Sequence, residues 1–125
     1  MEGLKKRFEA EIEKYRASQK EKEKCVSQRQ QLEAQLTENR LVADELGRLG
    51  EANPVYKLIG PVLVRQDLQE AQANVAKRLE FINAEIKKQE GHLSELEKRQ
   101  AGHKEAMEKI QAQLQQSQLK AAIKS

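Results

Sequence analysis

Apolar residues recur along the chain in a heptad pattern that is interrupted near the middle. From Leu4, alternating steps of four and three residues meet mostly apolar side chains at both ends of the first segment and polar ones at its centre. This spacing is typical of a helix that packs along one stripe in a coiled coil. The positions are Leu4, Phe8, Glu11, Tyr15, Ser18, Lys22, Cys25, Arg29, Leu32, Leu36, Asn39, Ala43 and Leu46, with Ile12 and Val26 beside them.

The same steps describe the second segment more regularly. The positions are Leu68, Gln72, Val75, Leu79, Ile82, Ile86, Gln89, Leu93, Leu96, Gln100, His103, Met107, Ile110, Leu114, Ser117 and Ala121. We call both sets the core positions. The pattern predicts two helices, over about residues 4–47 and about 67–121, that pack on each other as an antiparallel coiled-coil hairpin.

Helix-ending and helix-starting residues frame the interruption. Gly47 and Gly50 follow the first helix, and Pro54 prevents its continuation. Asp67 is suited to cap the second helix, with Glu70 three residues later. These signals predict a separate element over about residues 54–66.

That element has the pattern of a β-hairpin with apolar residues on both faces. Two β-branched runs, 55–59 and 62–64, flank Gly60 and Pro61. A two-stranded ribbon is marginal in water, and nothing else in the chain is available to cover its faces. We therefore interpret it as an assembly element that other chains complete. The candidate assembly residues are Val55, Tyr56, Leu58, Ile59, Val62, Leu63 and Val64.

Pairing the helices outward from the hairpin end gives explicit contacts. If Leu46 faces Leu68 at the hairpin end, and both helices rise equally per residue, then Leu32 faces Ile82. Glu11 then faces His103 as a polar pair within the core. The whole chain, residues 1–125, is predicted to be one domain of mainly α class.

Some apolar residues lie away from the core positions. Leu41, Val42 and Leu49 cluster near the hairpin, and Phe81 lies beside Ile82. Isolated exposed apolar residues are ordinary, but such a concentration favours subunit contacts.

The far end of the helix pair has an apolar tip. The second helix outruns the first by about ten residues, so that Leu119 and Ile123 have no partner helix. The tip is either a frayed tail or a surface offered to a binding partner. The candidate tip residues are Leu4, Phe8, Ile12, Leu114, Leu119 and Ile123.

The amino-acid composition excludes several classes of protein. Of 125 residues, 34% are charged and 3% aromatic, which is too polar for an ordinary globular core. The net charge of +3 comes from interspersed signs, and no aromatic residues alternate with basic ones, which argues against nucleic-acid binding. No apolar run approaches a membrane span, and the residues MEGLKKRFEAE carry charges and lack the apolar core that is typical of a signal peptide. A single cysteine, Cys25, excludes an intrachain disulfide. We expect a cytoplasmic protein without membrane contact.

The sequence shows no pattern of residues that is typical of an enzyme active site. His92 and His103 are eleven residues apart on one helix, without a third ligand at metal spacing. Cys25 occupies a core position, where a small buried side chain is the simpler role. Gly60 has no glycine partners for a phosphate loop. We expect no enzyme activity, no catalytic residues, no cofactor and no metal.

The order helix, single hairpin, helix resembles the β-type subunits of the prefoldin family. The similarity is carried by QLEAQLTENRLVADEL (31–46), VYKLIGPVLV (55–64) and NVAKRLEFINAEIKK (74–88). It covers most of the chain. Pro61 is a departure, because relatives commonly have a polar residue at this turn, and proline removes one donor from the strand ladder.

The resemblance implies a subunit of a hexamer that contains two α-type and four β-type chains. Their hairpins form a double β-barrel, with 55–59 and 62–64 as strands, and coiled coils extend from it. The tips hold unfolded clients, notably actin and tubulin, and deliver them to the cytosolic chaperonin without using a nucleotide. A coiled-coil scaffold or adaptor is the alternative that periodicity alone leaves open.

Overall fold

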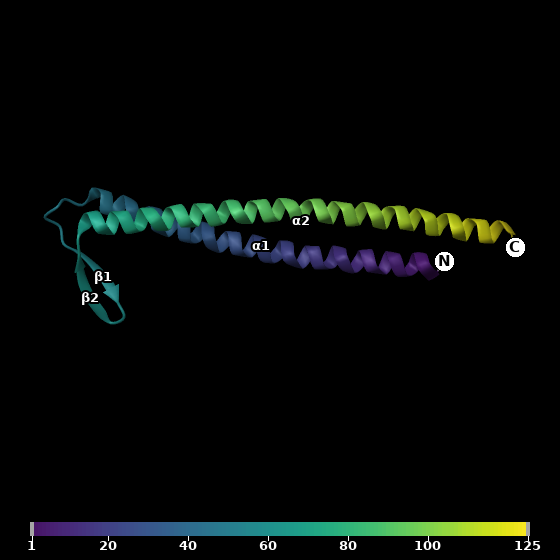
Figure 1. The fold of residues 1–125 in the computed structure, drawn as a ribbon, viewed down its shortest axis with the longest axis horizontal. Coiled ribbons are helices and arrows are strands. Elements are labelled where there is room, and N and C mark those ends of the chain that lie inside the picture. Colours follow the sequence, from purple (N-terminus) through teal and green to yellow (C-terminus); the bar gives the residue numbers. More distant parts are fainter. Residues whose placement is uncertain (1, 125) are drawn as a thin grey trace. The chain divides into compact units, whose positions relative to one another are not determined.

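The protein consists of two long helices with one antiparallel β-hairpin between them. The computed structural model describes residues 2–124. The order of elements is α1 (Glu2–Arg48), β1 (Val55–Ile59), β2 (Val62–Gln66) and α2 (Leu68–Lys124), as Figure 1 shows. The predicted fold class is therefore confirmed.

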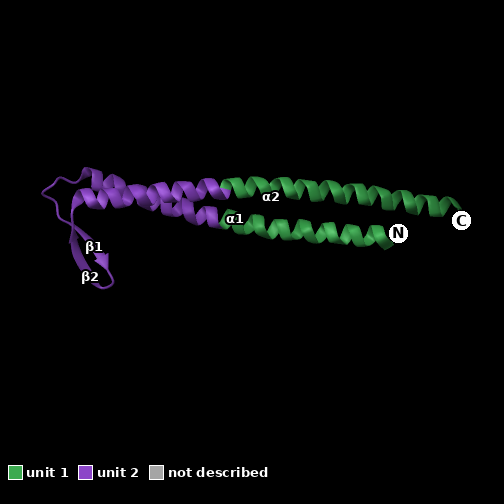
Figure 2. Ribbon diagram, viewed as in Figure 1, with its two compact units in different colours: residues 1–27, 90–125 green, residues 28–89 purple. Residues whose placement is uncertain are grey.

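The chain forms two compact units, coloured separately in Figure 2. Residues 1–27 and 90–125 make up unit 1, in which the first half of α1 packs against the second half of α2. Residues 28–89 make up unit 2, which contains the rest of both helices and the hairpin. The candidate assembly residues thus belong to unit 2, and the candidate tip residues to unit 1.

The heptad pattern correctly predicts which side chains pack inside. Every core position of α1 is buried or half-buried, and the same holds on α2 except for Gln72 and Ala121, which are exposed. Of the two residues beside the α1 stripe, Ile12 is half-buried and Val26 is 37% exposed. The stripe at period 3.5 is therefore the surface that each helix presents to the other.

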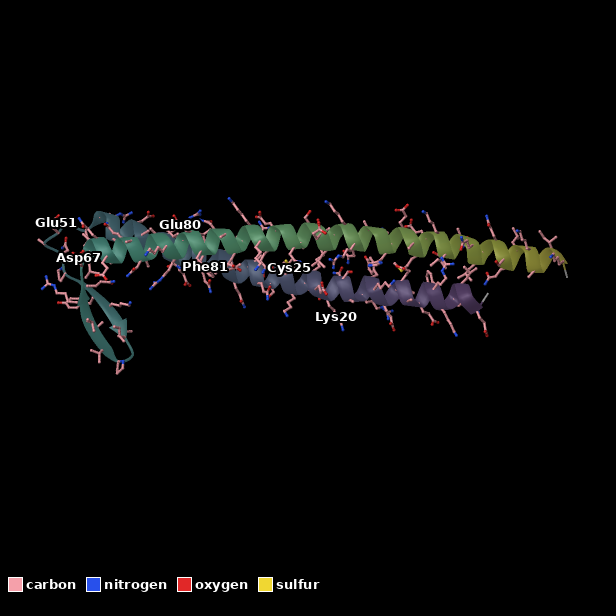
Figure 3. The ribbon with its side chains drawn as sticks, in the orientation of Figure 1. Lys20, Cys25, Glu51, Asp67, Glu80 and Phe81 are labelled. Atoms are coloured by element: carbon pink, nitrogen blue, oxygen red, sulfur yellow. The ribbon has the colours of Figure 1, made fainter. Side chains whose placement is uncertain are left out.

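Unit 1 combines apolar and polar packing. Cys25, Leu96 and Ile110 are buried, and Figure 3 marks Cys25 on α1 beside α2. Ser18 and Gln100 are buried as well, and the Gln100 amide donates a hydrogen bond to the Gln19 side chain. Buried polar groups need such partners, because an unpaired one would be costly. The buried amide of Gln100 is thus satisfied by a hydrogen bond across the helix pair.

The apolar core of unit 2 lies next to the hairpin. It consists of Leu46, Ala71 and Val75, with Ala43, Val55, Leu68 and Leu79 packed against it. A hydrogen bond joins the two helices beside this core. The Gln72 Nε2 group donates to the Leu46 carbonyl at 3.2 Å, which satisfies an acceptor near the end of α1.

The predicted cap of α2 is confirmed. The Asp67 carboxylate accepts a hydrogen bond from the Glu70 amide at 3.3 Å. Gly47, by contrast, lies inside α1, and Gly50 lies in the following turn, where its amide donates to the Asn53 side chain at 2.8 Å. Neither glycine has a positive φ, so α1 does not end in a left-handed glycine, and the Leu49 amide donates to the Leu46 carbonyl at 3.3 Å at this end.

The axial pairing of the helices differs from the predicted one. In unit 2, Ile82 lines one hollow with Gln35 and Asn39 of α1, from which we infer that Leu36, the core position between them, faces Ile82 in place of Leu32. In unit 1, Lys22 pairs with Glu97 at 3.8 Å, about one and a half helical turns beyond His92, the residue expected from the pairing at the hairpin end. A heptad pattern defines which residues face inward but not how far one helix is displaced along the other, so the displacement could not be read from it.

This pairing predicts a specific cross-link within one chain. In a Cys25→Ala background, Leu36→Cys with Ile82→Cys should form an intramolecular disulfide under mild oxidation, because facing core residues bring Cβ atoms close. Leu32→Cys with Ile82→Cys is the matched control and should cross-link more slowly. Non-reducing gel mobility and peptide mapping provide the measurement. Cross-links that form only between chains would contradict the antiparallel hairpin.

Candidate assembly and client-binding surfaces

The hairpin has a regular two-residue connection. Residues pair from Val55 with Gln66 to Ile59 with Val62, and Leu58 lies directly opposite Leu63. Gly60 has φ +58°, and it is the one described residue with a positive φ. A positive φ at the first turn position followed by the fixed negative φ of proline fits a type II′ turn. Gly60 and Pro61 therefore suit this turn, although proline is a departure from the family pattern.

The register places apolar side chains on both faces of the hairpin. Cross-strand partners share a face, and neighbours along a strand alternate between faces. One face therefore carries Tyr56, Leu58 and Leu63, with Arg65 at its end. The opposite face carries Val55, Ile59, Val62 and Val64, together with Lys57 and Gln66.

Almost all of these apolar side chains are exposed. Leu58 is 67% exposed and Leu63 66%, and Val55 alone is half-buried because it packs against the core of unit 2. The remaining exposed candidates are Tyr56, Ile59, Val62 and Val64. A ribbon that is apolar on both faces and open along both edges is the kind of surface that other strands cover.

The candidate tip residues divide into two groups. Leu4, Phe8, Ile12 and Leu114 are half-buried. Leu119 and Ile123 are 63% and 75% exposed near the end of α2, which runs past the start of α1 within unit 1. They are four residues apart, so that they lie on one face of the helix. The exposed part of the predicted tip is therefore the pair Leu119 and Ile123.

A polar contact in unit 1 confirms one predicted pair. The His103 ring donates from Nδ1 to Glu11 Oε2 at 2.8 Å, and Lys14 Nζ lies 3.6 Å from Glu11 Oε1. The His103 hydrogen bond is the main reason why the pKa of Glu11 is lowered, while partial burial opposes the shift and Lys14 adds to it. His103 thus acts as a hydrogen-bonding partner within the helix pair.

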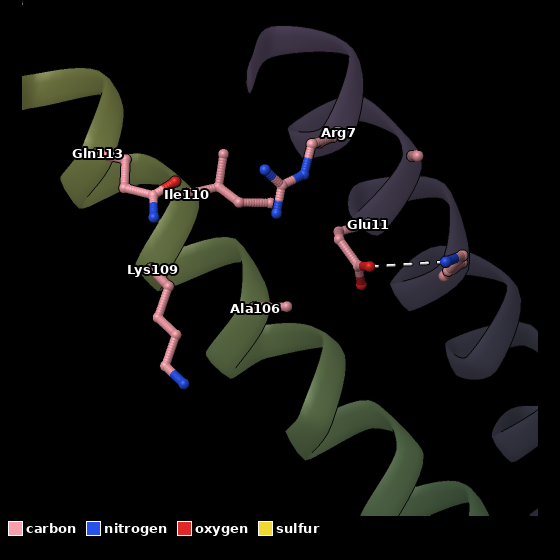
Figure 4. Close-up of a pocket in the computed structure, with 8 residues that line it drawn as sticks. Arg7, Glu11, Ala106, Lys109, Ile110 and Gln113 are labelled. Atoms are coloured by element: carbon pink, nitrogen blue, oxygen red, sulfur yellow. Dashed lines mark ion pairs between the residues drawn. The ribbon is translucent and has the colours of Figure 1, made fainter. Parts of the chain in front are cut away.

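A groove of about 410 Å³ lies beside this contact (Figure 4). Ala10 and Ala106 leave space between the helices, and Arg7, Lys14 and Lys109 bring positive charge to its walls. The Glu11 carboxylate is the acidic group among its lining residues, and it is held by Lys14 and His103. The groove has the open form of a helix-pair surface, without a convergent set of reactive groups.

Across residues 2–124, no group of three His, Cys, Asp or Glu side chains is placed to hold a metal ion. Neither helix has a segment, within those residues, that is long and apolar enough to cross a membrane.

Comparison with known proteins places the chain in a family. The prefoldin subunit family matches residues 9–118. The chain therefore belongs to this family, whose members are chaperone subunits. The family assignment confirms the resemblance carried by the hairpin and its flanking helices.

Two similar proteins and one solved structure show which prefoldin subunits this chain resembles. Prefoldin subunit 6 of Homo sapiens is 53% identical over 95 residues, which cover 76% of this chain and 74% of that protein. The Drosophila melanogaster protein called probable prefoldin subunit 6 is 50% identical over 94 residues, 75% of either chain. The crystal structure of the prefoldin beta subunit from Thermococcus strain KS-1 shares the fold, with a TM-score of 0.57 and 24% identity over 88% of this chain and 90% of that one.

Proposed function

We propose that this chain is a β-type subunit of a prefoldin hexamer that holds non-native polypeptides. The observation that carries the proposal is the hairpin, whose apolar side chains are exposed on both faces in a chain of the prefoldin family. Strands from other α-type and β-type subunits cover these faces and pair with the open edges. The whole chain acts as one prefoldin domain in this assembly.

Assembly uses the hairpin residues, and client holding uses the start of α1 and the end of α2. The assembly surface is formed by Val55, Tyr56, Leu58, Ile59, Val62, Leu63 and Val64. The client surface is formed by Leu119 and Ile123, with Leu4, Phe8, Ile12 and Leu114 behind them. Fully burying one such side chain is worth about 1.5–3 kcal/mol at most, so a single tip binds weakly. Several tips that bind one client together hold it firmly and still release it.

The remaining features of the proposed function are those that membership of the prefoldin family implies. The clients are unfolded or nascent chains of the actin and tubulin class, and the hexamer delivers them to the cytosolic chaperonin. The chain acts in the cytoplasm without turning over ATP, and it has no enzyme activity and needs no cofactor. Its partners are therefore proteins, with neither nucleic acid nor membrane among them.

A tip variant tests the client-holding role. Leu119→Ser with Ile123→Ser should leave hexamer assembly and thermal stability unchanged, because both side chains are exposed. It should lower the suppression of client aggregation partially, since five other tips remain. The measurement is light scattering after a denatured client is diluted into wild-type or variant hexamer. Leu41→Ser is a control that removes a comparably exposed apolar side chain elsewhere on the chain.

The alternative role, a coiled-coil scaffold without client holding, gives a different result. A scaffold assembles through the same hairpin, but its tip is an ordinary helix end. Unchanged suppression by the tip variant across several clients would favour the scaffold and remove the tip from the client surface.

A further inference from the structure

An exposed phenylalanine lies beside a hollow in unit 2 whose lining includes none of the assembly or tip residues. The hollow measures about 380 Å³ and is lined by Gln35 and Asn39 of α1 and by Lys77, Arg78, Phe81 and Ile82 of α2. Phe81, marked in Figure 3, is 65% exposed although it is one of two phenylalanines in the chain. A large aromatic side chain at the edge of a hollow is a typical anchor for a binding partner.

The rim of this hollow is positively charged. Lys77 and Arg78 are exposed, and neither takes part in any ion pair among residues 2–124. No carboxylate is found among the described residues that line the hollow. Its complement is therefore an apolar group with negative charge beside it.

The surface continues toward the hairpin. Arg78 also lines a second hollow of about 210 Å³, together with Val42 and Tyr56. Val42 is 46% exposed and Tyr56 55%. The second hollow includes the assembly residues Val55 and Tyr56, so the surface that stays free in the assembly is the hollow beside Phe81. That hollow suits a short stretch of polypeptide, in which apolar and acidic side chains follow one another.

We propose that this hollow, the Phe81 groove, binds segments of non-native client chains that carry a large apolar residue next to carboxylates. Phe81 packs against the apolar side chain, and Arg78 receives a carboxylate, for which its planar guanidinium offers two parallel donors. Lys77 adds positive charge on the same rim. The inference rests on the proposed client-holding function and adds to it a second capture point, with a preference for acidic clients.

The composition of the groove favours a transient occupant over a permanent one. It offers one aromatic anchor and two solvent-exposed cations, and exposed ion pairs contribute little to affinity. A site this small binds weakly by itself. When the same client is held at a helix tip, the second contact becomes intramolecular and gains from a high effective concentration.

The test uses two fluorescent peptides and the assembled hexamer. Both contain the same central Leu-Phe-Leu segment, which is flanked by glutamates in one peptide and by lysines in the other. Fluorescence anisotropy should show tighter binding of the glutamate peptide to wild-type hexamer. Phe81→Ser should raise the Kd of that peptide by about tenfold, as expected for truncation of an aromatic anchor. Lys77→Glu with Arg78→Glu should reverse the preference in favour of the lysine peptide.

A second charge variant supplies the matched control. Lys87→Glu with Lys88→Glu changes the charge equally at exposed positions of the same helix that do not line the groove. This variant should keep the preference for the glutamate peptide. A loss of preference equal to that of the groove variant would show a general charge effect and would overturn the proposal.

Two further measurements identify the occupant. An acidic protein that is kept unfolded by reduction and carboxymethylation should displace the glutamate peptide from wild-type hexamer. Failure to displace it would overturn the assignment to clients. Native mass spectrometry should show that Phe81→Ser hexamers stay intact. Their dissociation would make the groove a subunit interface and would also overturn the proposal.

The groove and the tip can fail independently. Leu119→Ser with Ile123→Ser should leave the peptide preference intact while it lowers aggregation suppression. Wild-type hexamer that suppresses aggregation but does not distinguish the two peptides would contradict the groove alone. Hexamer that distinguishes the peptides but does not suppress aggregation would contradict the client-holding function.

Discussion

Leu58→Asp with Leu63→Asp is expected to abolish hexamer formation while leaving the helix content of the chain almost unchanged. The two leucines lie directly opposite each other on one face of the hairpin and are 67% and 66% exposed. In the separate chain the aspartates would therefore remain in water. In the assembly they would be buried without partners, which is strongly unfavourable. Native mass spectrometry of co-expressed subunits measures assembly, and circular dichroism measures helix content.

The control places the same charges elsewhere. Leu119→Asp with Ile123→Asp introduces two aspartates at comparably exposed positions near the end of α2 and should still yield hexamer. A normal hexamer from the hairpin variant would contradict the assignment of the hairpin as the assembly element. Loss of helix content would show instead that the hairpin supports the fold of the separate chain.

Leu96→Ala is expected to lower the free energy of unfolding by about 2–4 kcal/mol. Leu96 is 1% exposed, the most deeply buried large side chain among the described residues. Its truncation removes apolar contacts and leaves a cavity between the helices of unit 1. A two-helix core can partly close such a cavity, so the loss should fall below the upper end of values known for globular proteins. Thermal and urea denaturation, followed by circular dichroism, provide the measurement.

Leu119→Ala is the matched control for this truncation. The same atoms are removed from a side chain that is 63% exposed, and stability should change by less than about 0.5 kcal/mol. Equal losses from Leu96→Ala and Leu119→Ala would contradict the burial of Leu96 in the helix pair.

The sequence predicted which residues face inward because the heptad period constrains them strongly. A polar residue such as Lys22 or Gln100 could be placed in the core by spacing alone, and both are shielded from full exposure. The hairpin was predictable for a related reason, since β-branched runs around Gly60 and Pro61 are incompatible with a continuing helix. Local pattern and backbone chemistry were sufficient for these elements.

The pairing along the helix axis was not predictable in the same way. Shifting one helix by a turn keeps apolar residues facing apolar ones, so the pattern could not separate Leu32 from Leu36 as the neighbour of Ile82. The predicted contact of Glu11 with His103 formed nevertheless, because both side chains are long enough to reach across the helix pair. Contacts between short side chains depend more closely on this displacement.

The Phe81 groove was only partly visible in the sequence. The position of Phe81 beside the core stripe indicated exposure, and its grouping with other off-stripe apolar residues favoured subunit contacts rather than client binding. The charged rim was not recognised, because Lys77 and Arg78 occur among many other charged residues of the helix. Only the spatial arrangement separates these two cations from neighbours that line no hollow.

The central claim is that one chain uses its hairpin for subunits and its helix tip for clients, and site-specific photo-cross-linking tests it most directly. A benzophenone amino acid is placed at Leu63 or at Leu119 in hexamer that holds a denatured client. The account predicts adducts with other prefoldin subunits from position 63 and adducts with the client from position 119. Client adducts from position 63, or none from position 119, would contradict it.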